Sequence, residues 1–421
     1  MQRAADALRR AVWAPIKQPR IDHKRLASRS RQSGIALMAM LTLLTLFGLS
    51  VFVGQLSATR FLAANAHSAA AALAEARDAL IADAISHASI SEAGYLRLPD
   101  LGVNLSEVAV EGEASANFSG NGKDRSVIGK LPSKTLDTGA LRDTVGECLW
   151  YVVSGRLQTA SVTDALNWDT QGQIDIIDGS GALVASNLAA LVVAPGRALD
   201  SQDRALADAA YAGCGGNYDA RNYLDTFENT NAVSGQVNYF AGSTNNRVAP
   251  DKNNKSFVMA ANDFYNDRYL WISVADIFDP LIRRRDFAAA IAQILDDPAF
   301  QTIPVSGIKG TEAFTCPTLP VKNFCKNWKE MLFLTELPTP AKITIDGKET
   351  ADPCRRVLIF AGRRGAGQSR NDDTQRGQPN NYLEDPNLAL FAVPTAAGTA
   401  FSGVSAFDYR TPANDILRCL P

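Results

Sequence analysis

Residues 35–54 read IALMAMLTLLTLFGLSVFVG, a run of 20 residues without a charged side chain. As an α-helix at about 1.5 Å per residue, this run reaches about 30 Å, the thickness of the apolar core of a bilayer. A helix that is apolar on every face is buried either in a protein interior or in a membrane. The length and the lack of charge favour the membrane, so we expect residues 35–54 to span it.

The charges of the chain divide at Gly34. Residues 1–34 hold nine basic and two acidic side chains, a net charge of +7, whereas the rest of the chain holds 33 basic and 42 acidic ones, a net charge of −9. A basic flank stays on the cytoplasmic side of a membrane, so the N-terminus is expected in the cytoplasm and the C-terminal bulk outside it. The whole-chain value of −2 does not suggest a nucleic-acid partner.

The apolar run continues into a second helical segment. Residues 55–86 are rich in Ala, Leu, Glu and Arg and contain no Gly or Pro, a composition typical of helices. Apolar positions there recur at helical spacing, at Leu73, Ala76, Leu80 and Ile81. A secretory signal peptide would have a shorter apolar run followed by a cleavage site. We therefore expect one helix of about 50 residues, whose second half packs against a globular domain.

The junction between leader and helix resembles that of type IV pilin and type II secretion pseudopilin precursors. Arg31-Gln32-Ser33-Gly34 ends the basic leader, and Ile35-Ala36-Leu37 begins the apolar helix. In that family a prepilin peptidase cuts after the Gly and methylates the new N-terminus. The resemblance implies cleavage between Gly34 and Ile35, residence in the inner membrane before assembly, and bundling of the mature helix with other pilins or pseudopilins in a filament.

Ala39 departs from the family pattern. Most members have Glu as the fifth residue of the mature chain, and its carboxylate is thought to neutralise the N-terminal ammonium of an adjacent subunit. An unpaired charge in an apolar core costs several kcal/mol. The large tip pseudopilin and some minor pilins also lack this Glu, so Ala39 indicates a low-copy tip or initiating subunit. The alternative is an uncleaved single-pass protein that anchors a periplasmic or surface binding domain.

The exported part contains two similar series of segments, which predict an internal duplication. The first series is Trp150–Val153, Ile174–Gly179, Leu191–Arg197, Ser201–Arg204 and Asn222–Asp225, and the second is Met331–Leu334, Ile343–Gly347, Val357–Arg363, Gly367–Arg370 and Asn381–Glu384. Asp178-Gly179 and Asp346-Gly347 predict two-residue hairpin turns. Residues 191–194 and 357–360 predict buried strands.

These patterns predict an α+β fold, with a long N-terminal helix followed by a large head that has antiparallel β-sheets, an internal duplication and covering helices. The predicted parts are a leader at 1–34, the pilin-like helix at 35–90, a first β-rich unit at 91–260, a connecting helix at 261–300 and a second β-rich unit at 301–421. Within the connecting part, apolar residues recur at helical spacing over 273–296.

All six cysteines lie in the part expected to be exported: Cys148, Cys214, Cys316, Cys325, Cys354 and Cys419. An even number of cysteines in an oxidising compartment predicts disulfides. Six cysteines allow 15 pairings, and the sequence does not choose among them. Proximity along the chain favours Cys148–Cys214, Cys316–Cys325 and Cys354–Cys419.

Catalytic chemistry has little support in the sequence. The three histidines, His23, His67 and His87, precede a long stretch without any, so Ser-His-Asp and Cys-His arrangements are not expected there. Loops rich in Asp and Asn could offer oxygens to calcium, but none has EF-hand spacing. Those loop residues are Asn121, Asp124, Asp251, Asn253, Asn254, Asn371, Asp372 and Asp373. We expect a structural protein without a cofactor or metal, calcium being the one alternative left open.

Overall fold

The computed structural model describes residues 32–102, 110–118, 125–160, 165–200, 202–204, 214, 216–225, 249, 252–260, 265–318, 323–394 and 400–421. Within the first helix, side chains are described for residues 36–52 and 67–86. The helices are α1 Gln32–Ser86, η1 Ala220–Asn222, α2 Val274–Leu281, α3 Arg285–Leu295, η3 Pro298–Gln301, α4 Phe324–Trp328, η4 Lys329–Met331, α5 Asp373–Arg376, η5 Pro379–Asn381 and α6 Asn387–Ala392. The strands are β1 Val127–Lys130, β2 Trp150–Val153, β3 Ile174–Asp178, β4 Leu183–Leu188, β5 Ala190–Ala194, β6 Lys255–Met259, β7 Arg268–Ile272, β8 Leu332–Ala341, β9 Thr344–Ile345, β10 Lys348–Glu349, β11 Cys354–Phe360, β12 Ser402–Gly403 and β13 Ile416–Leu420.

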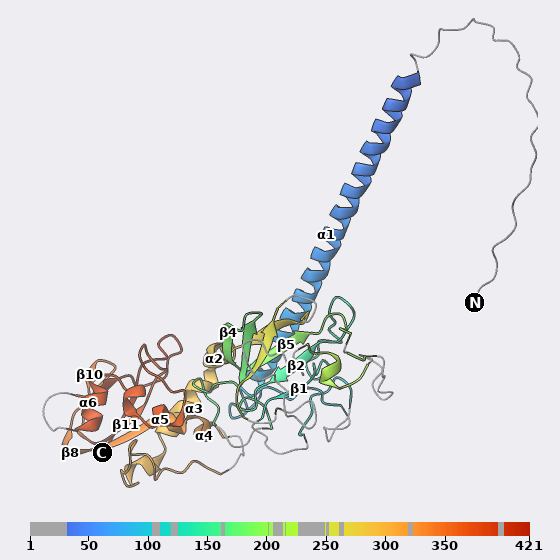
Figure 1. Ribbon diagram of the computed structural model, residues 1–421. Helices are drawn as coiled ribbons and strands as arrows, with labels where there is room; N and C mark the ends of the chain where they lie inside the picture. The colour runs from blue at the N-terminus through green and yellow to red at the C-terminus, as the bar shows by residue number, and fades with distance from the viewer. Residues whose placement is uncertain are drawn as a thin grey trace, which may run out of the picture. The chain divides into compact units, whose positions relative to one another are not determined.

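The expected long helix is present as α1, which runs 55 residues without a break (Figure 1). The chain divides into two compact units, residues 1–63 and residues 64–421, the second of which we call the head. No helix contains, among its described residues, an apolar stretch long enough to cross a membrane.

The C-terminal part of α1 belongs to the head and is amphipathic, as its sequence predicts. Leu73, Ala76 and Leu80 are at most 5% exposed, while Ile81 is half-buried. Ala84 continues the same stripe one turn further on. Because residues three and four apart share a helix face, these side chains form one apolar stripe, and they enter the main core cluster of the head.

Two arginines fix this part of α1 to the head. Arg77 donates from Nε to the backbone oxygen of Trp271 at 3.0 Å and forms an ion pair with Asp276 at 2.7 Å. Arg284 donates to the backbone oxygens of Ile85 and His87 at the end of α1. The last carbonyls of a helix have no intrahelical donor, so Arg284 satisfies acceptors that the helix leaves open.

The first set of strands, β2 to β7, forms two sheets that we call the first β module. The larger sheet has the order β2-β5-β7, and β1, from outside this set, pairs with its β2 edge; all of its pairs are antiparallel. The smaller sheet has the order β4-β3-β6, in which β3 pairs antiparallel with β4 and parallel with β6. One face of the larger sheet contributes Tyr151, Val153 and Val192 to the core cluster that includes α1. The opposite face contributes Trp150 and Val152 to a second cluster with the smaller sheet.

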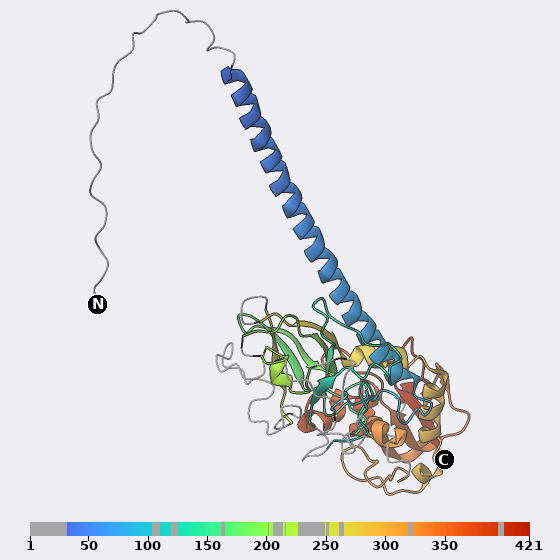
Figure 2. The same ribbon diagram turned by 90° about the vertical axis from the view of Figure 1, so that its right-hand side faces the viewer.

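The second β module, β8 to β13, repeats this connectivity strand for strand. Its larger sheet has the order β8-β11-β13, antiparallel throughout. Its smaller sheet has the order β10-β9-β12, again with one antiparallel and one parallel pair. The two modules occupy separate parts of the head, the first green to yellow and the second orange to red in Figures 1 and 2.

The strand registers agree between the modules in detail. Ala194 lies opposite Arg268 at the start of β7, and Phe360 lies opposite Ile416 at the start of β13. On the other side of the same strands, Val193 lies opposite Trp150, and its counterpart Ile359 lies opposite Phe333. The structural counterpart of Trp150 is therefore Phe333, two residues beyond the Met331 that the sequence comparison aligned with it.

The hairpin turns differ between the modules. Asp346 and Gly347 form a two-residue turn, with Ile345 opposite Lys348 and φ values of 54° and 73°, as predicted for a type I′ turn. Asp178-Gly179 does not form one, because Ile177 lies opposite Leu183 and five residues intervene. The carboxylate of Asp178 there accepts hydrogen bonds from the backbone of Ser180 and Ala182, which stabilises the longer loop.

The region between the modules contains two helices where the sequence predicted one. The side chain of Ser273 begins α2 with a capping box completed by Asp276. Pro280 lies in the last turn of α2, and Arg284 caps α3 with extended backbone. The predicted connecting segment 261–300 also includes β7, which belongs to the first module.

The head contains three disulfides, Cys148–Cys214, Cys316–Cys325 and Cys354–Cys419. They are the three pairs that proximity along the chain favours. Disulfides of this kind persist in oxidising, extracytoplasmic compartments.

Candidate functional site

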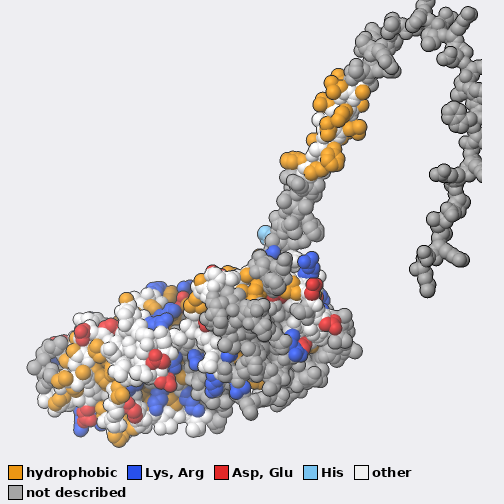
Figure 3. Space-filling view, viewed as in Figure 1, with side chains coloured by type: hydrophobic (Ala, Val, Ile, Leu, Met, Phe, Trp, Pro, Cys, Tyr) orange, Lys and Arg blue, Asp and Glu red, His pale blue; other side chains and the backbone are white. Residues whose placement is uncertain are grey.

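The residues at the expected processing site lie in α1. Gly34 and Ile35 are part of the helix backbone, and their side chains lie outside the described residues. Ala39 is exposed. The large apolar side chains from Leu37 to Phe52 are between 45% and 75% exposed, and Figure 3 shows them as orange atoms along the helix. A surface this apolar is typical of contact with lipid or with other helices.

In the head, the predicted repeat segments meet around an arginine in each module. In the first module, the guanidinium of Arg204 donates to the backbone oxygens of Asn222 and Gly196, both at 2.7 Å. It also donates to Gln202 Oε1 at 2.6 Å and lies 4.9 Å from the ring centre of Tyr223. One cation therefore holds together the loop after β5 and the turn at η1.

The second module builds the same contacts around Arg370. This guanidinium donates to the backbone oxygens of Asn381 at 2.6 Å and Gly362 at 3.2 Å, and to Gln368 Oε1 at 3.3 Å. It lies 4.2 Å from the ring centre of Tyr382. We call these two arrangements the arginine clamps.

A buried carboxyl lies immediately before the last strand of each module. In the first, burial and the neighbouring Asp225 carboxyl raise the pKa of Asp267 well above its usual value. In the second, burial, together with a smaller contribution from the Glu384 carboxyl, raises the pKa of Asp415 to about 7. Asp415 accepts hydrogen bonds from the side chain of Asn387 at 2.8 Å and the backbone of Gly362 at 3.3 Å.

The second clamp also ties the modules together. Arg370 and Asp169 form an ion pair at 2.7 Å, and both side chains are at most 1% exposed. Nearby, Asn167 donates to the backbone oxygen of Asn327 at 2.9 Å. Trp168 packs against Trp328 with ring centres 4.6 Å apart. Because leaving either charge unpaired in the interior would be costly, this ion pair links the two modules.

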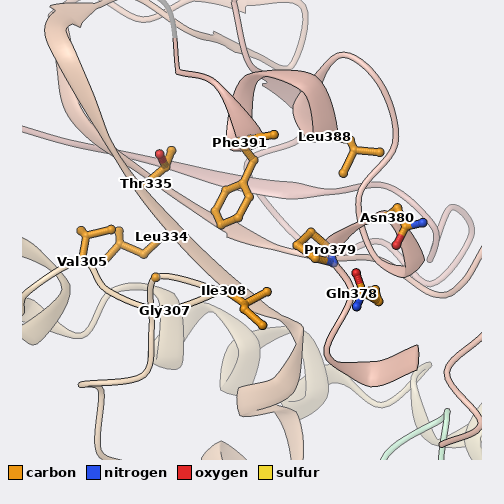
Figure 4. Close-up of a pocket in the computed structure, with 12 residues that line it drawn as sticks. Val305, Gly307, Ile308, Leu334, Thr335, Gln378, Pro379, Asn380, Leu388 and Phe391 are labelled. Atoms are coloured by element: carbon orange, nitrogen blue, oxygen red, sulfur yellow. The ribbon is translucent and has the colours of Figure 1, made fainter. Parts of the chain in front are cut away.

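A pocket of about 430 Å³ opens beside β8 in the second module. Its walls come from the loop before β8, from β8 itself, from η5 and from α6 (Figure 4). The lining residues are Val305, Gly307, Ile308, Gly310, Leu334, Thr335, Gln378, Pro379, Asn380, Leu388, Phe391 and Ala392. The lining combines apolar side chains with the amide groups of Gln378 and Asn380, the hydroxyl of Thr335 and exposed backbone, so it presents polar and apolar surface in about equal parts.

A second pocket of about 410 Å³ is lined by Lys309, Thr311, Glu312, Lys326, Lys329 and Glu330. Burial lowers the pKa of Lys309 to about 8, and its ammonium donates to the backbone oxygen of Glu330 at 2.6 Å. The ammonium of Lys329 donates to the backbone oxygen of Phe314. Two of the three lysines are therefore engaged by the protein itself, which makes this pocket a poor anion site.

The loop residues considered for calcium do not converge where the structure describes them. Asn121, Asp124 and Asp251 lie outside the described residues. Asn254 donates to Asp175 and Asn187, and Asp372 caps α5 by accepting from Gln375. Across the described part of the chain, no group of three or more His, Cys, Asp or Glu side chains is placed to hold a metal ion.

Two features of the site escaped the sequence comparison. The last strands of the modules share the dipeptides Asn266-Asp267 and Asn414-Asp415 at their starts, a signal that could have extended the repeat. Lys130 and Lys309 each place their ammonium near the clamp tyrosine of their module, but they come from segments without similar sequences.

No protein-family model, curated protein or solved structure matches this chain.

Proposed function

We propose that this chain is a pilin-like structural subunit of a type IV pilus or type II secretion filament, present in low copy at the tip or in initiation. The observation that carries the proposal is that the two parts of α1 have different surroundings. Its first part presents exposed apolar side chains over residues 36–52, directly after the basic leader. Its second part is fixed to the head by a buried stripe and by Arg77 and Arg284.

In this proposal the apolar run 35–54, which extends beyond the described side chains at both ends, first spans the inner membrane with the leader in the cytoplasm. Prepilin peptidase then cuts after Gly34 and methylates Ile35. The released helix bundles with the helices of other pilins or pseudopilins. Ala39 has no carboxylate to offer a neighbouring ammonium, which suits a subunit that has no such neighbour.

The head would act by binding and shape, without catalysis. Its two modules share strand order, registers and arginine clamps, from which we infer an internal duplication. The three disulfides suit a periplasmic or cell-surface head in a Gram-negative bacterium. A duplicated head is bulky for a repeating shaft, which favours a position at the filament tip.

Processing can be tested in cells that express the full chain with and without an active prepilin peptidase. We expect the peptidase to shorten the chain by its 34-residue leader, as seen on gels. Gly34→Leu should block the shortening, because the family's peptidase cuts after Gly. Gln32→Ala, two residues away, serves as the matched control and should be processed normally. A chain that keeps its full length beside the active peptidase would contradict the proposal.

Ala39 also favours a second candidate, an uncleaved single-pass protein that anchors a periplasmic or surface binding head. This candidate keeps residues 1–34 as a cytoplasmic tail. The two candidates share the membrane orientation and differ in the fate of the leader, so the same experiment separates them.

A further inference from the structure

The first module shows what covers the outer edge of its larger sheet. Strand β1 pairs with β2 there, with Val127 opposite Val153 and Ile128 opposite Val152. The side chain of Ile128 is fully buried in the cluster that contains Trp150, Val152 and Tyr223. An extended segment with a β-branched side chain therefore completes this edge and its core.

The corresponding edge in the second module belongs to β8. The aromatic pairs fix the correspondence, because Trp150 and Tyr223 have ring centres 4.9 Å apart, and Phe333 and Tyr382 have ring centres 5.3 Å apart. Counting from Phe333, the counterparts of Val152 and Val153 are Thr335 and Glu336.

Among the described residues, backbone hydrogen bonds cover only the start of the β8 edge. The backbone N–H of Leu334 donates to the backbone oxygen of Lys309 at 2.8 Å, and the hydroxyl of Thr311 donates to the backbone oxygen of Leu332. The chain then turns away through Gly307 and Gly310, both with positive φ. Among the described strands, β8 has β11 as its partner and lies at the edge of its sheet.

The 430 Å³ pocket lies where β1 would continue. Thr335 lines the pocket, and its counterpart in the first module is Val152, which lies opposite Ile128. Pro379, another lining residue, is the first residue of η5, and its counterpart Ala220 is the first residue of η1. Figure 4 shows the ring of Phe391 pointing into the pocket, with Leu388 beside it. Ile308 on the opposite rim is 57% exposed. Among the described residues, the site that Ile128 fills in the first module is thus an open pocket in the second, with apolar side chains at Leu388 and Phe391 and polar groups beside them.

We propose that this pocket binds a short extended segment of a partner polypeptide, which adds to the β8 edge as β1 adds to β2. The segment would place one β-branched apolar side chain in the pocket, in the position that Ile128 occupies. Its backbone would exchange hydrogen bonds with Glu336, the next residue after Leu334 whose N–H faces away from β11, and the pocket for its side chain would give specificity. The inference does not rest on filament assembly, because processed and unprocessed chains carry the same pocket.

The edge also sets the length of the segment. Lys309 already occupies the first pairing position, and its ammonium lies 4.1 Å from the ring centre of Tyr382. Beyond Glu336, Pro338 and Pro340 have no N–H to donate, and prolines of this kind protect an edge from further pairing. The open part therefore suits about three to four residues, the length of β1.

The probe is the chain's own covering segment, an end-capped peptide with the sequence of residues 125–129, RSVIG, carrying a fluorescent label. Binding to the full-length chain in detergent is followed by fluorescence anisotropy up to millimolar protein. We expect saturable binding, weakened at least tenfold when the peptide's Ile is replaced by Asp. Ala392→Trp fills the exposed side of the pocket and should weaken binding at least tenfold. Ala389→Trp, on the same helix but outside the lining, should change it less than twofold.

A second variant separates strand addition from simple filling of an apolar pocket. Glu336→Pro removes the N–H that the added strand would use and should also weaken binding at least tenfold. The proposal is overturned if RSVIG shows no saturable binding at millimolar concentration, if Ala392→Trp binds it like the unmodified chain, or if Glu336→Pro leaves the affinity unchanged.

Discussion

Replacing Arg370 by Met tests whether the second arginine clamp stabilises the head. The Arg370 side chain is 0% exposed and that of Asp169 is 1% exposed, and they pair at 2.7 Å. Removing one partner of a buried ion pair leaves an uncompensated charge, which costs about 3–5 kcal/mol. The backbone oxygens of Asn381 and Gly362 would lose a donor as well. We therefore expect Arg370→Met to lower the free energy of unfolding by at least about 3 kcal/mol.

The measurement is urea unfolding of the full-length chain, followed by tryptophan fluorescence at constant pH. Combining Arg370→Met with Asp169→Asn removes the unpaired charge, so the double variant should lose at least about 1 kcal/mol less than the sum of the single losses. Arg363→Met is the matched control, because Arg363 pairs with Asp279 at 2.6 Å but both side chains are at least 31% exposed. It should cost less than about 1 kcal/mol. A loss below about 1 kcal/mol for Arg370→Met, or additive single losses, would refute this reasoning.

Three further changes should have measurable effects. Replacing both Cys354 and Cys419 by Ser opens a disulfide with a sequence separation of 65 and should cost about 4 kcal/mol in the same unfolding assay. Asp415 holds its proton more tightly when folded, so its stabilisation is present at low pH and lost as pH rises towards about 7. Between the usual carboxyl pKa of 3.8 and the folded value of about 7, the unmodified chain should therefore lose stability as pH rises, relative to Asp415→Asn. The expected slope is up to about 1.4 kcal/mol per pH unit. Arg284→Ala removes the donor at the end of α1 and should speed amide hydrogen exchange in residues 80–86, with no such change for exchange in β11.

The helix and several of the strands could be predicted because their signals are local. An unbroken composition of strong helix formers predicts α1, and its stripe of small and apolar residues is buried as expected. Runs such as 191–194 and 357–360 are fully buried strands in the structure. The disulfide pairs follow the order of the cysteines along the chain.

The register of the repeat could not be read from the sequence. The alignment of Trp150 with Met331 is off by two residues, and a shift of two keeps every side chain on the same face of the sheet. Hydrophobic pattern alone therefore does not distinguish Met331 from Phe333. What distinguishes them is the contact of Phe333 with Tyr382, which arises only when β8 and η5 are brought together.

The candidate binding pocket could not be predicted for a similar reason. Its walls come from four segments separated along the chain. The pocket exists because the loop around Gly307 and Gly310 turns away from β8, whereas β1 in the first module stays paired with β2. The repeated segments contain both clamp arginines, Arg204 and Arg370, although no clamp was predicted from them. They did not indicate that Arg370 would also pair with Asp169, 201 residues away, in the other module.

The most direct test of the proposed function is the chemistry of the mature N-terminus. The chain should be recovered from the sheared filament fraction, and from membranes, of cells with an active prepilin peptidase, and its N-terminal peptide identified by mass spectrometry. Our account predicts that the peptide begins with N-methylated Ile35. An N-terminal peptide that still begins at Met1, from the same cells, would contradict it.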